Sequence, residues 1–100
     1  SNGAVKVGID GIYPNIDKII RDNKGFITTK KELLEYPTIT NNDGVFTQIN
    51  DYFYNNKYIL DALSLFNDNQ EIKVDIDWNL QININHNNKE YIAIIADYKV

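Results

Sequence analysis

The apolar residues of this chain recur with a helical period in its middle and with a strand period near its end. Across residues 44–67 they recur every three or four positions, which predicts one long amphipathic helix. The predicted stripe consists of Phe46, Ile49, Phe53, Leu60 and Leu63, with Val45, Tyr52, Ile59 and Phe66 at its shoulders. Residues 40–43 supply candidate N-caps, and Asn55-Asn56 is a weak point at which we allow a kink.

From Ile72 the period changes to two and its phase never slips. Even positions up to Ile84, Trp78 included, are apolar, whereas the odd positions between them are polar. This alternation predicts either one long twisted strand or two colinear strands with a bend near Asn79. We expect Trp78 to lie in the core and the odd-numbered face to be a solvated strand face.

Residues 86–89 predict a turn, and residues 91–100 predict a return strand. The centre of that strand is apolar on both sides, which is typical of a strand covered on both faces or of a site of further association. His86, the single histidine, is interpreted as a solvent-facing turn residue.

The first part of the chain reads as short strands and turns. Alternation predicts a strand over Val5–Ile9, and residues 18–29 read as a hairpin of two strands, 18–21 and Phe26–Thr29. Its turn would be Asn23-Lys24-Gly25, in which Asn23 and Gly25 tolerate a positive φ. Residues 30–35 predict a loop or one helical turn. The pattern leaves open whether residues 1–30 join the same sheet as 72–100.

Together these elements predict a single α+β domain over residues 1–100, with one long helix packed on an antiparallel β-sheet. Residues 1–3, Ser-Asn-Gly, read as the scar of tag cleavage. The chain is therefore interpreted as an excised domain, whose parent protein could carry a membrane anchor elsewhere.

Charge and composition exclude some functions. The formal net charge of −4 argues against a nucleic-acid ligand, which selects a basic surface. The absence of cysteine excludes disulfides, thiolate metal sites and a cysteine nucleophile. No apolar run approaches the roughly 20 residues that span a bilayer. The sequence contains no phosphate-binding loop or nucleophile elbow, and we expect no cofactor, no metal and no catalytic residue.

The odd-numbered face of residues 71–85 is the candidate ligand surface, because amide and carboxylate side chains can bind sugars or a partner's backbone. Its members, together with two helix tyrosines, are Asp75, Asp77, Asn79, Gln81, Asn83, Tyr54 and Tyr58. Two other interpretations stay open. Asp75 and Asp77 could share a cation or act as an acid/base pair, and the tyrosines could belong to the core.

Three short segments resemble a known family. They are 35–39 (Glu-Tyr-Pro-Thr-Ile), Ile49-Asn50 within the expected helix, and the alternating strand with its return strand, 75–84 and 91–95. This order is similar to the uncharacterised domain that precedes the catalytic domain of PdaC-type peptidoglycan deacetylases, and to the extracytoplasmic region of RsiV-type anti-sigma factors. The resemblance covers about residues 35–98. Ala93 stands where the family usually has serine, and a Gly-Gly-Ala-His type stretch is absent.

The resemblance implies a helix on an antiparallel sheet and a place in the envelope of a Gram-positive bacterium. It also implies a non-catalytic accessory or sensing role, in contact with cell-wall glycan or with a protein ligand such as lysozyme. A structural or oligomerisation domain is the alternative, because the apolar last strand could pair edge to edge with a partner. A small hydrolase using Asp75 and Asp77 is a third possibility.

Overall fold

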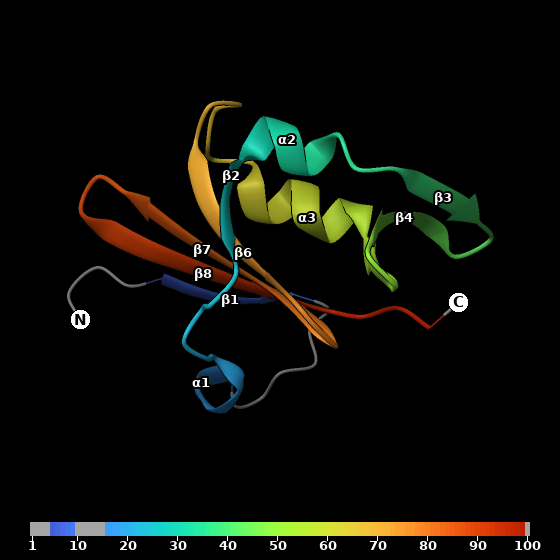
Figure 1. Ribbon diagram of the computed structural model, residues 1–100, viewed down its shortest axis with the longest axis horizontal. Helices are drawn as coiled ribbons and strands as arrows, with labels where there is room; N and C mark the ends of the chain where they lie inside the picture. The colour runs from blue at the N-terminus through green and yellow to red at the C-terminus, as the bar shows by residue number, and fades with distance from the viewer. Residues whose placement is uncertain (1–4, 10–15, 100) are drawn as a thin grey trace.

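The computed structural model describes residues 5–9 and 16–99, so the expected tag scar at residues 1–3 lies outside it. These described residues form two sheets and three short helices (Figure 1). The larger sheet contains, in spatial order, β1 (Val5–Ile9), β8 (Lys89–Ala96), β7 (Asn79–His86), β6 (Glu71–Ile76) and β2 (Phe26–Thr29). The smaller sheet contains β3 (Thr38–Asn41), β4 (Gly44–Ile49) and β5 (Tyr52–Asn55).

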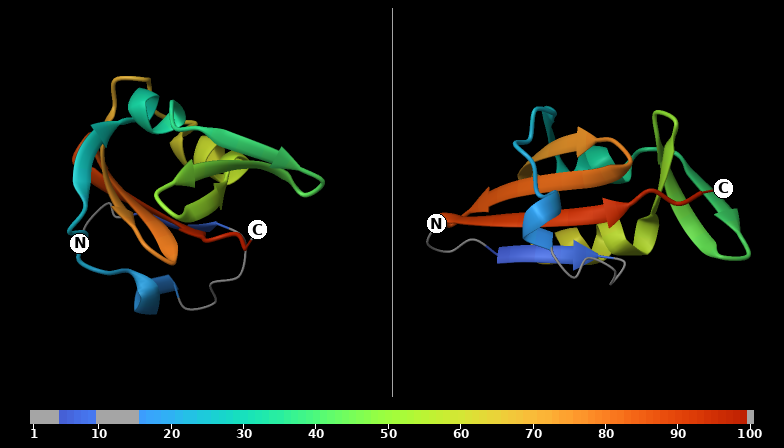
Figure 2. Two further views of the ribbon diagram at one scale, coloured as in Figure 1. Left: turned by 45° about the vertical axis from the view of Figure 1, so that its right-hand side comes forward. Right: turned by 90° about the horizontal axis from the view of Figure 1, so that it is seen from below.

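The helices lie on opposite faces of the larger sheet. Helices α2 (Lys30–Leu34) and α3 (Asn56–Leu63) lie on one face, and α1 (Ile16–Ile19) lies on the other (Figure 1). The smaller sheet extends to one side of this sandwich, so that its β3–β4 hairpin projects from the body (Figure 2). β1 runs parallel to β8, whereas all the other strand pairs are antiparallel.

The predicted long helix over residues 44–67 is wrong. Residues 44–55 form the β4–β5 hairpin, in which Ile49 pairs with Tyr52 across an Asn50-Asp51 turn and Asn50 has a φ of 55°. The fold is therefore mostly β, with only short helices, and not one long helix on a sheet. Valine, isoleucine, threonine and aromatic side chains favour strands, and the local turn outweighs the apparent helical spacing.

Helix α3 begins where the sequence analysis allowed a kink. The side-chain oxygen of Asn55 accepts a hydrogen bond from the backbone N–H of Lys57, so Asn55 is the N-cap of the helix. Ile59 and Leu63 then face the core one turn apart. The helical period is therefore genuine only after residue 55.

The alternating segment is neither one long strand nor two colinear strands. It folds back at Asp77-Trp78, and Ile76 pairs with Leu80 to make the β6–β7 hairpin. Even-numbered residues pair with even-numbered residues across this hairpin, so the apolar side chains stay on one face of the sheet on both sides of the turn. The alternation of apolar and polar residues therefore gives no sign that the chain reverses direction. Trp78, expected in the core, lies in this turn with 53% of its surface exposed.

The first strand and the last strand are confirmed. β1 and β2 lie at the two edges of the larger sheet, so the early residues do join the strands of 72–100. The hairpin expected over residues 18–29 is wrong, because α1 occupies residues 16–19 and no strand precedes β2 directly. β8 lies between β1 and β7, and residues 92–95 are buried, as the apolar run predicted.

The core lies between the larger sheet and helices α2 and α3. Its buried members are Leu33, Ile49, Tyr54, Ile59, Leu63, Phe66, Ile72, Val74, Leu80, Ile82, Ile84, Ala93 and Ile95. Ile92 and Ile94 are also buried, but they share the opposite face with Asn83 and Gln81, with which they pair. Burial of these apolar side chains is the main favourable term in folding.

The C-terminal residues join the two sheets. The backbone N–H of Asp97 donates to the carbonyl of Trp78 at 2.9 Å, and the N–H of Tyr98 donates to the carbonyl of Phe53 at 2.7 Å. Asp97 Oδ1 also accepts a hydrogen bond from the N–H of Phe53 at 3.3 Å. Residues 97 and 98 therefore connect β5 to the β6–β7 turn.

The turn predicted over residues 86–89 is confirmed, and it gives a testable prediction. Asn87 and Asn88 have φ values of 51° and 62°, the left-handed pair that a two-residue type I′ turn requires. Asn88→Gly should stabilise the domain by about 0.5 kcal/mol, and Asn88→Ala should destabilise it by about 1 kcal/mol. Urea unfolding measures both changes.

Asn69→Gly is the matched control, because Asn69 is exposed and its φ is not positive. The control should not gain stability. Equal effects of glycine at positions 69 and 88 would contradict the assignment of the turn.

Candidate functional site

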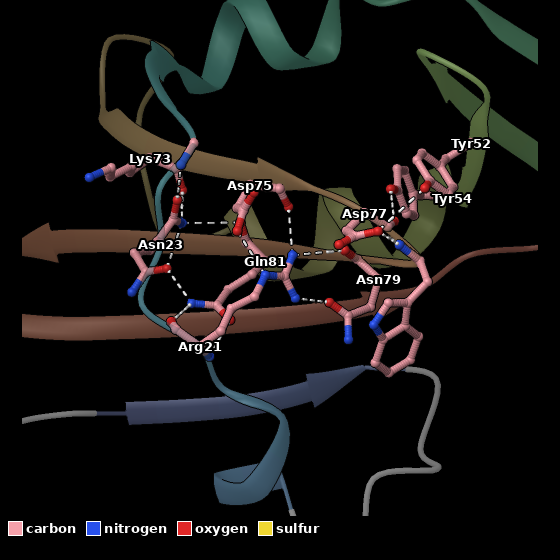
Figure 3. A network of polar contacts seen from close by, with 12 residues as sticks. Arg21, Asn23, Tyr52, Tyr54, Lys73, Asp75, Asp77, Asn79 and Gln81 are labelled. Carbon is pink, nitrogen blue, oxygen red and sulfur yellow. Dashed lines mark hydrogen bonds and ion pairs between the residues drawn. The ribbon is translucent and has the colours of Figure 1, made fainter.

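The odd-numbered face of β6 and β7 is covered by a segment of the same chain. Residues 21–25, which we name the clasp, cross this face between α1 and β2 (Figure 3). Gln81 binds the clasp through both atoms of its side-chain amide. Its Oε1 accepts a hydrogen bond from the backbone N–H of Arg21 at 3.0 Å, and its Nε2 donates to the carbonyl of Arg21 at 2.8 Å. A buried glutamine thus pairs with the clasp as a neighbouring strand would.

The guanidinium group of Arg21 forms the charged part of the clasp. Its Nε donates to Asp75 Oδ2 at 2.7 Å, and its Nη1 donates to the side-chain oxygen of Asn79. Its Nη2 donates to the carbonyls of Asp75 and Asn79 at 3.2 and 3.1 Å. Charge-assisted hydrogen bonds of this kind are about twice as strong as neutral ones. Arg21 therefore compensates the charge of Asp75 on a partly buried surface.

The other end of the clasp is held by Asn23. Its Nδ2 donates to Asn83 Oδ1 at 2.8 Å and to the carbonyl of Lys73 at 3.1 Å. Its Oδ1 accepts the N–H of Gly25 at 2.9 Å. Gly25 is required for close approach, because a Cβ at this position would lie 1.7 Å from the carbonyl oxygen of Val74. Sequence analysis attributed this glycine to a positive φ, and the reason is instead the contact with β6.

The expectation that the odd-numbered face is solvated is therefore wrong for its centre, whereas Glu71, Asp77 and Asn85 are exposed. Asn79 and Gln81 are fully buried, and Asp75 and Asn83 are half-buried. Asp77 lies in the β6–β7 turn, where its Oδ1 accepts hydrogen bonds from the N–H of Trp78 at 2.8 Å and the hydroxyl of Tyr52 at 3.3 Å. The centre of the polar face is therefore occupied by residues 21–25 of the same chain.

The two candidate tyrosines lie in different surroundings. Tyr54 is fully buried in the core, and its hydroxyl donates to the carbonyl of Asp77 at 2.5 Å. Burial raises the pKa of Tyr54 far above its ordinary value of 10.0. Tyr58 is half-buried and borders an open groove. Only Tyr58 therefore remains available to a ligand.

Asp75 and Asp77 do not act as a pair in this geometry, since Asp75 contacts Arg21 while Asp77 contacts Tyr52. Within residues 5–9 and 16–99, no three side chains of His, Cys, Asp or Glu are grouped closely enough to hold a metal ion. His86 is half-buried rather than solvent-facing. Its Nδ1 lies 2.9 Å from Gln70 Oε1, and its ring packs edge-on against Phe66.

Two of the open grooves in the described part of the chain contain candidate residues. The polar groove, of about 320 Å³, continues the odd-numbered face beyond the clasp and is lined by Asp22, Asn23, Ile27, Glu71, Ile72, Lys73, Asn83, Asn85 and Glu90. The aromatic groove, of about 240 Å³, lies where the two sheets meet and is lined by Phe46, Asn55, Tyr58, Ala96, Asp97, Tyr98 and Lys99. Candidate Asn83 thus lies in the polar groove, and candidate Tyr58 lies in the aromatic one.

The wall of the aromatic groove is rigidly supported. The ring of Tyr98 stacks on Phe46 with centroids 3.9 Å apart, and its hydroxyl donates to Asp43 Oδ2 at 2.5 Å. That hydrogen bond is the main reason why the pKa of Tyr98 is raised. Lys99 Nζ lies 2.8 Å from Asp97 Oδ2, and this contact raises the pKa of Lys99.

Sequence analysis missed most of this groove. Phe46 had been placed in a helix, and residues 97–99 had been read as the end of a strand. The available signal was Asp97-Tyr98-Lys99, an aromatic residue between opposite charges directly after an apolar strand.

No family model, curated protein or solved structure matches this chain. The family resemblance therefore stays a prediction, and one of its segments differs from the pattern, because Ile49-Asn50 lies at the end of β4 and in a turn instead of in a helix. No helix in the described part of the chain is long and apolar enough to cross a membrane.

The buried hydroxyl of Tyr54 predicts a loss of stability at alkaline pH. The folded protein holds this proton more tightly than the unfolded chain, whose tyrosines titrate near pH 10. The stabilisation that the protonated Tyr54 hydroxyl contributes is therefore complete below about pH 10. It is lost as the pH rises toward the higher pKa of the folded state. Between pH 9 and 11.5, the free energy of unfolding should fall more steeply for the wild type than for Tyr54→Phe.

Urea unfolding at a series of pH values checks this expectation. At pH 8, Tyr54→Phe should already cost about 1 kcal/mol, because it removes the hydrogen bond to the carbonyl of Asp77. Parallel pH profiles for the two proteins would contradict the assignment.

The close approach of Gly25 to β6 predicts that Gly25→Ala displaces the clasp. Overlap with a backbone carbonyl should cost at least about 2 kcal/mol, whereas Lys24→Ala at the exposed neighbour should change stability by less than about 0.5 kcal/mol. The NMR signals of the Gln81 side-chain amide report directly on the clasp. Unchanged Gln81 signals and full stability in Gly25→Ala would show that the contact is not formed.

Proposed function

We propose that this domain is a non-catalytic binding module of a Gram-positive cell envelope, and that the aromatic groove holds cell-wall glycan. The observation that carries this proposal is the composition of the groove. It presents two half-buried tyrosine side chains, Tyr58 and Tyr98, beside the half-buried amide of Asn55 and the exposed ammonium group of Lys99. The envelope location rests on the family resemblance.

A sugar ring offers an apolar face of C–H groups and a rim of hydroxyls. Aromatic surface with a few well-placed polar groups is the usual composition of a ligand pocket. Tyr58 and Tyr98 would contact the apolar face. Asn55 Nδ2 and Lys99 Nζ would donate hydrogen bonds to the hydroxyls, because a side-chain amide nitrogen carries two donor hydrogens and an ammonium group carries three. Since the Tyr98 ring is fixed by Phe46 and Asp43, it loses little freedom when a ligand binds.

A binding role without catalysis is supported by how the carboxylates are used. Asp97 is tied to Lys99 and to the N–H of Phe53, and Asp43 accepts the Tyr98 hydroxyl. An acid/base pair would need two carboxyl groups that face one bound substrate, and these two act instead as supports for the groove wall.

Association through a sheet edge is the second candidate function. The last strand cannot provide the edge, because β8 lies between β1 and β7. β3 pairs with β4 on one side, no described strand pairs with its other side, and three of its four residues are exposed. An uncharged edge strand of this kind can pair with another chain. Association through β3 is therefore favoured over association through β8.

A titration of isotope-labelled domain with soluble peptidoglycan fragments tests the proposal. Saturable amide shifts should appear at Asn55, Tyr58 and residues 97–99. Tyr58→Leu should weaken binding about tenfold, which corresponds to about 1.4 kcal/mol.

Lys99→Ala should also weaken binding, whereas Lys57→Ala, on an exposed position of α3 outside the groove, is the matched control and should not. Equal affinities of the wild type and Tyr58→Leu, or shifts that avoid the groove, would overturn the proposal. A shift pattern confined to β3 at increasing protein concentration would instead support edge association.

A further inference from the structure

The outer edge of β2 is open. In the larger sheet β2 pairs with β6 on one side, and no described strand pairs with its other side. Figure 2 shows β2 at the margin of the sheet, next to the clasp. Proline and charged residues usually protect an edge strand from pairing with another chain. Residues 26–29, Phe-Ile-Thr-Thr, include neither. Backbone N–H and C=O groups on this edge are therefore available to an added strand.

The edge carries two exposed apolar side chains on opposite faces. Phe26 is 42% exposed and Ile27 is 58% exposed. Phe26 pairs with Val74 on the core side, whereas Ile27 pairs with Lys73 on the side of the polar groove. A strand added beside β2 would place alternate side chains against these two residues. Apolar surface on both faces of one open edge favours an extended peptide over a compact small molecule.

The charged residues of the polar groove favour a cationic ligand. Asp22, Glu71 and Glu90 line it with negative charge, and Lys73 is the one cationic residue among its lining residues. A ligand side chain placed beside Ile27 on this face would lie close to these carboxylates. The clasp already illustrates the chemistry, because Arg21 is bound on the same face by a carboxylate and by amide and carbonyl oxygens.

We propose that β2 and the polar groove together bind an extended cationic peptide segment of a partner protein by strand addition. Main-chain hydrogen bonds to β2 supply the pairing, and the groove selects a lysine or arginine on alternate positions of the ligand. A second copy of this chain fits poorly. Two such edges brought together would bring the same three carboxylates near each other, and like charges in proximity oppose association.

The test uses isotope-labelled domain and a capped heptapeptide of alternating valine and lysine. Saturable amide shifts should appear at residues 26–29 and at Asp22 and Glu71, and affinity should fall as salt is raised. A valine–glutamate heptapeptide of the same length should bind at least about tenfold more weakly. Equal binding of the two peptides, or no saturable shifts with the lysine peptide, would overturn the proposal.

Strand addition is separated from simple charge attraction by N-methylation of the peptide backbone. Only one edge of the peptide faces β2, so methylating one alternate set of amides should abolish binding and methylating the other set should leave it nearly unchanged. If both methylated peptides bound like the parent, charge alone would account for the binding and the proposed pairing would be wrong.

Two protein variants locate the site. Ile27→Lys adds a positive charge at the edge and should weaken binding of the lysine peptide about tenfold or more. Leu65→Lys makes the same change at a residue that is 80% exposed and outside the polar groove, and should leave binding unchanged. Equal effects of the two variants, or self-association of the free domain through β2 in sedimentation experiments, would exclude the cationic peptide as the occupant of this edge.

Discussion

Buried amide and carboxylate groups on the odd-numbered face of β6 and β7 constrain the rest of this fold. A buried polar group without a partner costs about 1–3 kcal/mol, and Asn79 and Gln81 are fully buried. The clasp supplies the missing partners through Arg21 and Asn23. Asn79 Nδ2 has no hydrogen-bond partner among residues 5–9 and 16–99. The path of the chain from α1 to β2 is thus determined by the need to satisfy this face.

The two faces of the larger sheet are consequently stabilised by different physics. Helices α2 and α3 pack on one face through apolar contacts, which are strong but not directional. The clasp binds the other face through hydrogen bonds whose donors and acceptors must coincide in position. Directional contacts fix register, so the polar side of the sheet specifies where β2 begins, and Gly25 allows the approach.

Sequence patterns identified strands more reliably than their connections. The predictions of β1, β2 and a buried β8 were confirmed, because alternation and apolar runs report directly on strands. The hairpin at Asp77 could not be recognised from the sequence, since even-numbered residues pair with even-numbered residues across it and the alternation continues unchanged. The helix over 44–55 was wrong, because turn residues at 42–44 and 50–51 outweigh a chance helical period. Candidate site residues could be found on one strand, but no local pattern reveals that Arg21 reaches Asp75, 54 positions away.

The joint made by residues 97 and 98 has a consequence for the order in which the domain can assemble. Phe53 and Asp97 are 44 positions apart, so the residues of β4 and β5 are synthesised well before the residues that anchor them. Closing so large a loop is entropically costly, and β8 must first be placed beside β7. We therefore expect the hydrogen bonds of residues 97 and 98 to the smaller sheet and to the β6–β7 turn to form late in folding, after β8 has paired with β7.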